Sequence, residues 1–323
     1  MADGGDGTVE LFVDSGAQAR TVLVHDPLGR IVEARFAIDG DRAIVEMAGA
    51  SGLTLLRAEE RDPWRADTRG TGELIAAALD AGAREIVVGI GGSATNDAGV
   101  GFLRALGARI DPPQAVHGIE RIDLSAIDVR LRHARLVVAS DVDNPLCGPS
   151  GASRMFGAQK GAKPSDLERL DKELARTADA MALALGRDLR NEPGAGAAGG
   201  LGFALLAVGA TIRPGVDVVA EIAGLPEALK GARLCLTGEG AIDAQTLRGK
   251  TVAGVGRYAA RAGVPVIAFA GSLDIAAEAA LRAAGIVCAP VTPRPMTLQE
   301  ALGEAEALLE AAAARALALW VLR

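Results

Sequence analysis

Two acidic residues and an amide follow directly after one of the predicted strands. The apolar run ARLVVAS (134–140) is followed by DVDNPLCG, which contains Asp141, Asp143 and Asn144. Ligands of open α/β sheets bind beyond the carboxyl ends of the strands. Carboxylates in that place suit Mg²⁺, which prefers one or two carboxylates together with phosphate oxygens and water. The alternative is an Asx turn closed by Pro145, but two acids at one strand end favour a functional interpretation.

A second acidic segment follows the run ARLCLTG (232–238). It reads EGAIDAQTLRGKT and contains Glu239, Asp243 and Lys250. Its GKT ending is like that of a P-loop, but that motif needs a glycine five residues before Gly249, and position 244 is alanine. The segment is therefore not a P-loop. It still predicts an ammonium group and a helix N-terminus beside two carboxylates, which favours a functional site over a solvated charged face.

A third polar loop follows the run EIVVGI (85–90). Its sequence, GGSATND, combines glycines, hydroxyls, an amide and an acid at the start of a predicted helix. Free backbone amides and a helix dipole can hold an anion such as phosphate, whereas the alternative is an ordinary N-cap with turn glycines. The candidate binding residues are Gly91, Gly92, Ser93, Thr95, Asn96 and Asp97.

Two further glycine-flanked segments are candidates for binding. FGAQKGAK (156–163) contains Lys160, one of only five lysines in the chain; the alternative for it is a flexible surface turn. The opening MADGGDGT alternates glycine and aspartate as a tight ligand-binding loop would, although chain starts are rarely functional. Its candidate residues are Asp3, Gly4, Gly5 and Thr8.

Together these groups indicate phosphoryl transfer. That reaction depends on positioning and charge neutralisation more than on a covalent nucleophile, and carboxylates, ammonium groups and amide-rich loops supply both. The three histidines are scattered, and the chain has neither Ser-His-Asp spacing nor a Cys-His pair. Acyl transfer is therefore unsupported.

Composition excludes several classes of protein. The net charge is −7 and only 3% of residues are aromatic, which argues against nucleic acid or a membrane surface as a partner. The chain contains no apolar stretch of about 18 residues. Its three cysteines are odd in number and lack metal-binding spacing, so we expect a protein of the reducing cytoplasm.

Hydrophobic periodicity predicts the elements that position these loops. Residues 9–50 alternate with DPLG and DG turns, which predicts an antiparallel meander. From residue 71, apolar runs alternate with helical patterns, which predicts a mostly parallel sheet covered by helices. We expect an α/β fold with a doubly wound, Rossmann-like domain and a second α/β domain that contains the meander. The expected domains are 66–150 plus 229–323 and 1–65 plus 151–228.

At these motifs the chain resembles the bacterial glycerate kinase family. The resemblance covers nearly the whole chain, in the family's order, and rests on MADGGDGT, GIGGSATNDAGVGFLRALGA, ASDVDNPLCGPSGASRMFGAQKGA, GAGAAGGLGFALLA, LTGEGAIDAQTLRGKTVAGV and VTPRPMTLQEAL. It implies ATP-dependent phosphorylation of D-glycerate, with Mg²⁺, by a two-domain α/β protein with a cleft. It favours 2-phosphoglycerate over 3-phosphoglycerate as the product.

The resemblance also implies roles for the candidate residues. Asp141 and Asp143 would bind Mg²⁺ or activate the glycerate hydroxyl, while Glu239 and Asp243 would form a second acidic group near the phosphates. Lys250 would neutralise charge in the transition state. The expected metal ligands are Asp141 and Asp243. The 91–97 loop and Lys160 would hold the substrate carboxylate or phosphate, and Asp3, Gly4, Gly5 and Thr8 would line the other side of the cleft.

The resemblance further implies that a first βα unit precedes MADGGDGT in the family, so we expect this chain to start late relative to it. Two alternatives stay open. One is a nicotinamide-dinucleotide-dependent oxidoreductase, because residues 89–94 fit G-x-G-x-x-A and Asp111 lies about 20 residues further on. The other is a non-catalytic ligand-binding protein. The sequence does not fix the oligomeric state and is compatible with a homodimer.

Overall fold

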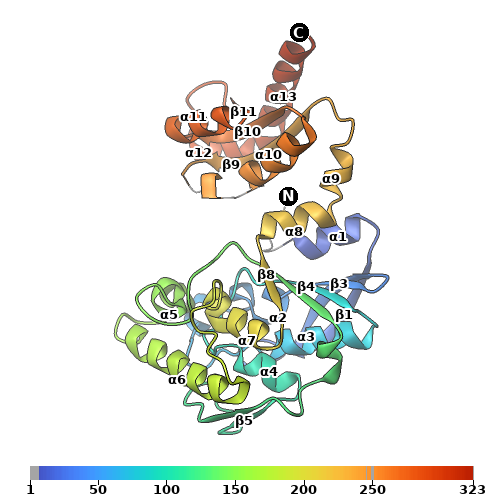
Figure 1. Ribbon diagram of the computed structural model, residues 1–323. Coiled ribbons are helices and arrows are strands. Elements are labelled where there is room, and N and C mark those ends of the chain that lie inside the picture. Colours follow the sequence, from blue (N-terminus) through green and yellow to red (C-terminus); the bar gives the residue numbers. More distant parts are fainter. Residues whose placement is uncertain (1–6, 245, 249–250, 323) are drawn as a thin grey trace. The chain divides into compact units, whose positions relative to one another are not determined.

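The computed structural model describes residues 7–244, 246–248 and 251–322 (Figure 1). The chain divides between Gly215 and Val216 into two compact units, the larger unit before this boundary and the smaller unit after it. Each unit has its own sheet and its own apolar core.

The larger unit is built on a six-stranded sheet in the order β1-β2-β3-β4-β7-β8. Its first two pairings are antiparallel and the other three are parallel. A separate antiparallel ribbon joins β5 to β6. The strands are β1 (Gln18–His25), β2 (Ile31–Asp39), β3 (Arg42–Glu46), β4 (Glu85–Gly89), β5 (Arg109–Asp111), β6 (Arg121–Asp123), β7 (Arg135–Ala139) and β8 (Thr211–Arg213).

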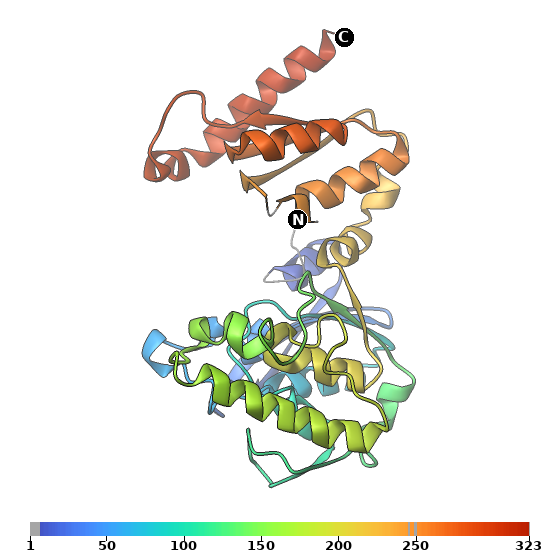
Figure 2. The ribbon, with the colours of Figure 1, turned by 60° about the vertical axis from the view of Figure 1, so that its left-hand side comes forward.

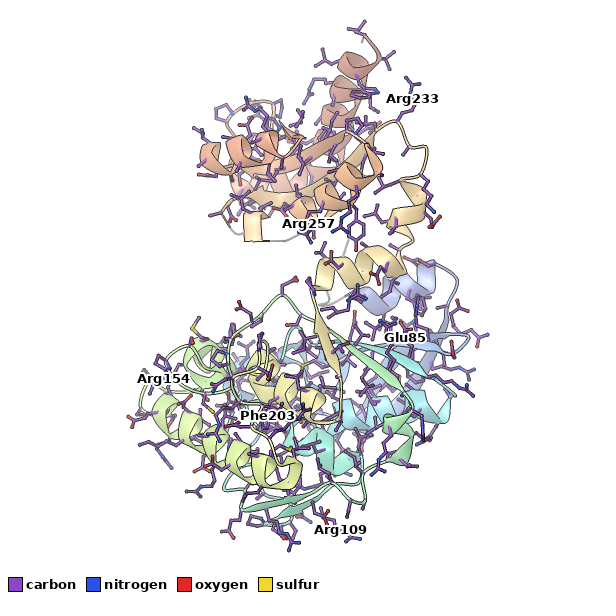
Figure 3. The ribbon with its side chains drawn as sticks, viewed as in Figure 1. Glu85, Arg109, Arg154, Phe203, Arg233 and Arg257 are labelled. Carbon is purple, nitrogen blue, oxygen red and sulfur yellow. The ribbon has the colours of Figure 1, made fainter. Side chains whose placement is uncertain are left out.

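Helices cover this sheet and supply the connections between its parallel strands. Figure 2 shows the long α6 passing in front of α7. The helices are α1 (Thr8–Asp14), α2 (Ala48–Ser51), α3 (Arg69–Asp80), α4 (Val100–Ala105), α5 (Ala152–Phe156), α6 (Leu167–Leu185) and α7 (Leu201–Ala207). The core lies between these helices and the sheet: Figure 3 shows Phe203 packed inside the unit, while Arg109 is exposed on β5.

The smaller unit has a three-stranded parallel sheet in the order β11-β10-β9. Two apolar runs, Val266–Leu273 and Ile286–Pro290, form its central strand and one edge, and their inward residues build the core with α10 and α11. The elements are α8 (Gly215–Ile222), which begins at the boundary, α9 (Leu225–Ala228), β9 (Cys235–Ile242), α10 (Thr251–Ala262), β10 (Val266–Leu273), α11 (Ile275–Ala283), β11 (Ile286–Pro290), α12 (Leu298–Gly303) and α13 (Ala305–Val321).

The predicted fold class is confirmed: the chain is mixed α/β with a mostly parallel sheet and an antiparallel portion. The predicted domain division (66–150 plus 229–323, and 1–65 plus 151–228) differs from the structure. The reason is that β3, the last strand of the meander, pairs in parallel with β4. This pairing joins the meander and the strands near 85 and 135 in one sheet, whereas the strands after residue 229 form a sheet of their own.

One local expectation is corrected. The meander begins at Gln18, because residues 8–14 form the helix α1 instead of a strand. The short strand β8 was not predicted. Near the carboxyl end of the chain, Glu304 separates two helices, α12 and α13.

Candidate active site

The carboxyl ends of four strands meet at one edge of the larger sheet. Since β3, β4, β7 and β8 run parallel, Glu46, the loop after Gly89 and the segment after Ala139 all begin there. Two of the three polar segments that the sequence singled out, GGSATND and DVDNPLCG, therefore lie at the same edge. That edge is the usual ligand-binding side of such a sheet.

Most residues of the GGSATND loop are buried in the protein, and few of them are exposed to solvent. Ser93 is 6% exposed and the next residues, Thr95, Asn96 and Asp97, are buried. Two backbone hydrogen bonds fasten the loop to the segment after α2: the amide of Leu53 donates to the carbonyl of Gly92 (2.8 Å), and the amide of Ala94 donates to the carbonyl of Ser51 (2.9 Å). Gly91 and Gly92 form the accessible part of the loop.

Asp97 has a structural role. Its Oδ2 atom accepts hydrogen bonds from the amide and the hydroxyl of Thr68 (2.9 and 2.8 Å) and from the amide of Gly101 (3.0 Å), and its Oδ1 accepts from the amide of Gly99 (3.0 Å). The amides at the start of α4, which the sequence offered as an anion site, thus already serve this carboxylate. For Asp97 the alternative interpretation, a local cap, describes the geometry.

Asn96 and Lys160 also act within the protein. Asn96 donates through Nδ2 to the hydroxyl of Ser153 (3.0 Å). The Nζ atom of Lys160 donates to Ser93 Oγ (3.0 Å) and to the carbonyl of Thr95 (2.6 Å). Lys160 is 2% exposed, so the interpretation as a flexible surface turn is wrong. Burial lowers the pKa of its ammonium group to about 7.

Asp141, Asp143 and Asn144 follow directly after β7, at the carboxyl edge of the sheet. Asp141 accepts a hydrogen bond from the amide of Gly215 (2.9 Å) through Oδ1, and the side chain of Asp143 is exposed. Asn144 donates through Nδ2 to the carbonyl of Ser150 (3.1 Å), while its Oδ1 is buried and has no hydrogen-bond partner in the described part of the chain. An unsatisfied buried oxygen usually has an unseen water, ion or ligand as its partner.

Glu46, at the end of β3, lies at the same edge of the sheet and was not singled out from the sequence. Its Oε1 accepts hydrogen bonds from the amides of Thr8 and Val9 at the start of α1, the second at 3.0 Å. The sequence did not indicate this position because the meander was assigned to a different domain from the strand near 85, whereas β3 pairs with β4. Thr8 itself is buried. The other candidates of this segment, Asp3, Gly4 and Gly5, lie outside the described residues.

The smaller unit brings Glu239 and Asp243 together through a third residue. The hydroxyl of Thr246 donates to Glu239 Oε1 and accepts from the amide of Asp243 (3.2 Å). Glu239 lies within β9, which extends to Ile242, and not in a loop after the strand as expected. Thr246 was missed, although its spacing of three from Asp243 is typical of a local polar turn. Lys250 lies outside the described residues.

A pocket of about 1200 Å³ adjoins Glu239. It opens between the ends of β9 and β10, the segment 291–297 and the helices α12 and α13, and its lining is largely apolar, with Phe269 and Ala301 among the lining residues. Small-molecule sites are mostly apolar with a few placed polar groups, and Glu239 and Arg294 supply charge here.

The described residues can be compared with the features that a metal site, a membrane span or a dinucleotide site would require. Within residues 7–244, 246–248 and 251–322, no three His, Cys, Asp or Glu side chains cluster closely enough to form a metal site by themselves. None of the helices in those ranges is both long and apolar enough to span a bilayer. Asp111, which the oxidoreductase alternative requires at the end of a parallel strand, lies at the end of β5, in the antiparallel ribbon. The position of Asp111 therefore contradicts the oxidoreductase alternative.

Comparisons with known proteins assign the chain to the ATP-dependent small-molecule kinases. The chain belongs to the glycerate kinase family, whose family model matches residues 1–321. It is 44% identical to a glycerate kinase of Halalkalibacterium halodurans over 97% of this chain and 86% of that protein. It is 45% identical to the glycerate 2-kinase of Escherichia coli K12 over 84% of this chain and 75% of that protein.

A solved structure confirms the similarity of the fold. It is the crystal structure of a protein from Salmonella typhimurium LT2 that has been assigned provisionally as glycerate kinase 2. The TM-score is 0.83 at 41% identity, over 99% of this chain and 88% of that one. The resemblance on which the sequence interpretation rested is thus confirmed at the level of the family and the fold.

The structural role of Asp97 is testable by Asp97→Asn. Because asparagine turns an NH₂ group towards amide donors, we expect the free energy of unfolding to fall by about 2–4 kcal/mol. The two tryptophans, Trp64 and Trp320, lie in different units, so Trp64 fluorescence in a Trp320→Phe background follows urea unfolding of the larger unit. The exposed Asp39→Asn is the control, with a change below about 0.5 kcal/mol. Equal urea midpoints for Asp97→Asn and its parent would contradict the assignment.

Proposed function

We propose that the protein is a D-glycerate kinase that transfers the γ-phosphate of ATP to the C2 hydroxyl and forms 2-phosphoglycerate in the cytoplasm. The observation that carries the proposal is the 45% identity, across 84% of this chain, to a protein named glycerate 2-kinase. In this reaction the hydroxyl oxygen forms a bond to the γ-phosphorus, the bond to the bridging oxygen breaks, ADP leaves, and the hydroxyl proton passes to a base.

The carboxylates after β7 support the roles that we propose for them. Asp141 and Asp143 lie at the carboxyl edge of the larger sheet, where a bound hydroxy acid would contact them. A general base must come within hydrogen-bonding reach of the proton that it takes, and the exposed Asp143 is accessible to a substrate. We propose Asp143 as the base and Asp141 as a metal ligand.

The donor atoms present fit Mg²⁺. The ion typically binds one or two carboxylates and leaves its other positions to phosphate oxygens and water. Asp141 and the unsatisfied Oδ1 of Asn144 offer oxygen ligands of that kind within four residues. The ion would neutralise the charge on the phosphates when it is bound. Asp243, the other expected ligand, belongs to the smaller unit and stays a proposed metal ligand.

The pocket beside Glu239 supports nucleotide binding by the smaller unit. Its largely apolar lining suits a purine and a ribose. We propose that the phosphates of the bound nucleotide would then lie near Glu239 and Asp243. Lys250 keeps the role that the family resemblance implies, neutralisation of charge in the transition state.

The proposed function first predicts the product of the reaction. With ATP, Mg²⁺ and D-glycerate, we expect a phosphorus NMR signal of 2-phosphoglycerate, and no turnover when EDTA removes the metal. A 3-phosphoglycerate signal would support the kinase activity but refute the proposed transfer to the C2 hydroxyl. Absence of any phosphorylated acid, with nucleotide still bound, would instead favour the non-catalytic ligand-binding alternative.

The second prediction concerns Asp141. In Asp141→Asn the Oδ1 that accepts from Gly215 is retained, so the fold should persist, whereas the negative charge for the metal is lost. We expect kcat to fall by about 100-fold or more and the Mg²⁺ concentration for half-maximal rate to rise. Asp39→Asn, an exposed acid at the end of β2, is the matched control and should match the parent. A parental kcat for Asp141→Asn would remove Asp141 from the reaction.

The third prediction concerns the pocket. Ala301→Trp places an indole among its lining residues, and we expect the KM for ATP to rise by about tenfold or more while the KM for D-glycerate stays the same. Gln299→Trp is the control, because Gln299 is an exposed residue of the same helix and does not line the pocket. An unchanged KM for ATP in Ala301→Trp would place the nucleotide elsewhere.

A further inference from the structure

The buried ammonium group of Lys160 has no role in the reaction proposed above. It reaches the underside of the loop after β4 from the short 3₁₀ helix at Ala158–Lys160 and contacts Ser93 and Thr95. Burying an ammonium group is costly, and an apolar side chain of similar length, such as methionine, would fill the same space without that cost. The charge therefore has to be explained by what it does to its two partners.

The hydrogen-bonding capacity of the Ser93 hydroxyl supplies that explanation. A serine hydroxyl has one proton and two acceptor positions. Both acceptor positions of Ser93 Oγ are used, one by Lys160 Nζ at 3.0 Å and one by the amide of Thr95 at 3.3 Å. For the hydroxyl proton the internal acceptors are the carbonyl and hydroxyl oxygens of Thr95, both at 3.4 Å. Hydrogen bonds of that length are weak, and the carbonyl already accepts from Lys160 at 2.6 Å.

We propose that Lys160 is a positioning residue whose ammonium group, by occupying the inner side of Ser93 Oγ, turns the Ser93 hydroxyl proton outward as the donor that binds the substrate carboxylate. Ser93 stands directly after the accessible Gly91 and Gly92, at the carboxyl edge of the sheet. The inference rests on the proposed function for the identity of the acid.

The charges around Lys160 determine how this arrangement responds to pH. The carboxylate of Asp97, from the same loop, faces Lys160 and favours its charged form, while burial disfavours that form more strongly. The charge of Asp97 acts in turn on Asp67 and Arg104; burial and the charge of Asp97 raise the pKa of Asp67 to about 6. When Lys160 loses its proton, its lone pair can accept the Ser93 proton, which then turns inward. Affinity for the acid should therefore fall as the pH rises through about 7.

Calorimetric titration of the full chain with D-glycerate, without nucleotide, tests this. We expect the Kd of the wild type to rise about tenfold from pH 6 to pH 8.5, the value of one hydrogen bond to a charged group. Lys160→Met and the smaller change Ser93→Ala should bind weakly, and equally so, at both pH values. Lys163→Met, three residues away and exposed, should follow the wild type.

A second measurement needs no substrate. With ¹⁵N-labelled lysine side chains, the chain has five signals, and we expect the one that is absent from Lys160→Arg to titrate near pH 7 while ordinary lysines titrate near about 10. A wild-type Kd that does not change with pH, or a parental Kd in Ser93→Ala at pH 6, would overturn the inference.

Failure of the inference can be distinguished from failure of the proposed function. If the wild type phosphorylates D-glycerate but its Kd ignores pH, Lys160 and Ser93, only the inference fails. If no acid is phosphorylated, inorganic phosphate replaces glycerate as the probe. Weaker phosphate binding in Ser93→Ala and Lys160→Met would then support Ser93 as an outward donor to an anion, and equal binding in all variants would overturn it.

Discussion

One carboxylate, that of Asp97, fixes the geometry of the loop that ends β4. Its four hydrogen bonds join the loop to Thr68, before α3, and to Gly99 and Gly101 at the start of α4. Between these bonds Ala98 has a φ of 53°, a left-handed conformation that costs alanine roughly 1 kcal/mol or more. Such a turn persists only where the surrounding contacts hold it in place, and the hydrogen bonds of Asp97 provide many of those contacts.

The position of Asp97 also decides what the loop can offer a ligand. Because its carboxylate takes the amides of Gly99 and Gly101, those amides are not available to an anion. Lys160 and the residues at the end of α2 hold the loop by hydrogen bonds, so its accessible part is limited to Gly91 and Gly92, with the 6% exposed Ser93 directly after them. The buried charges of Asp97 and Lys160 thus hold this loop in one conformation, and a reaction that depends on positioning would benefit from such a fixed loop.

The sequence predicted the elements and the chemistry better than it predicted their partners. The strands near 85 and 135 were identified because apolar runs of that kind are buried on both faces of a parallel sheet. The pairing of β3 with β4, which joins residues 42–46 to 85–89, is non-local and has no sequence periodicity, so the domain division and Glu46 were missed. Glycine, hydroxyl and acid patterns located the loops, but whether Asp97 or Lys160 faces a ligand or the core depends on packing.

The order of the two units along the chain has a consequence for synthesis on the ribosome. The residues that build the core of the larger unit, from Val22 to Ile212, precede the boundary at Val216. This part of the chain therefore emerges while the smaller unit is still being translated, and domains generally fold as units in that order. The six-stranded sheet can close its non-local β3–β4 pairing before the strands after residue 235 are present to compete for its edges.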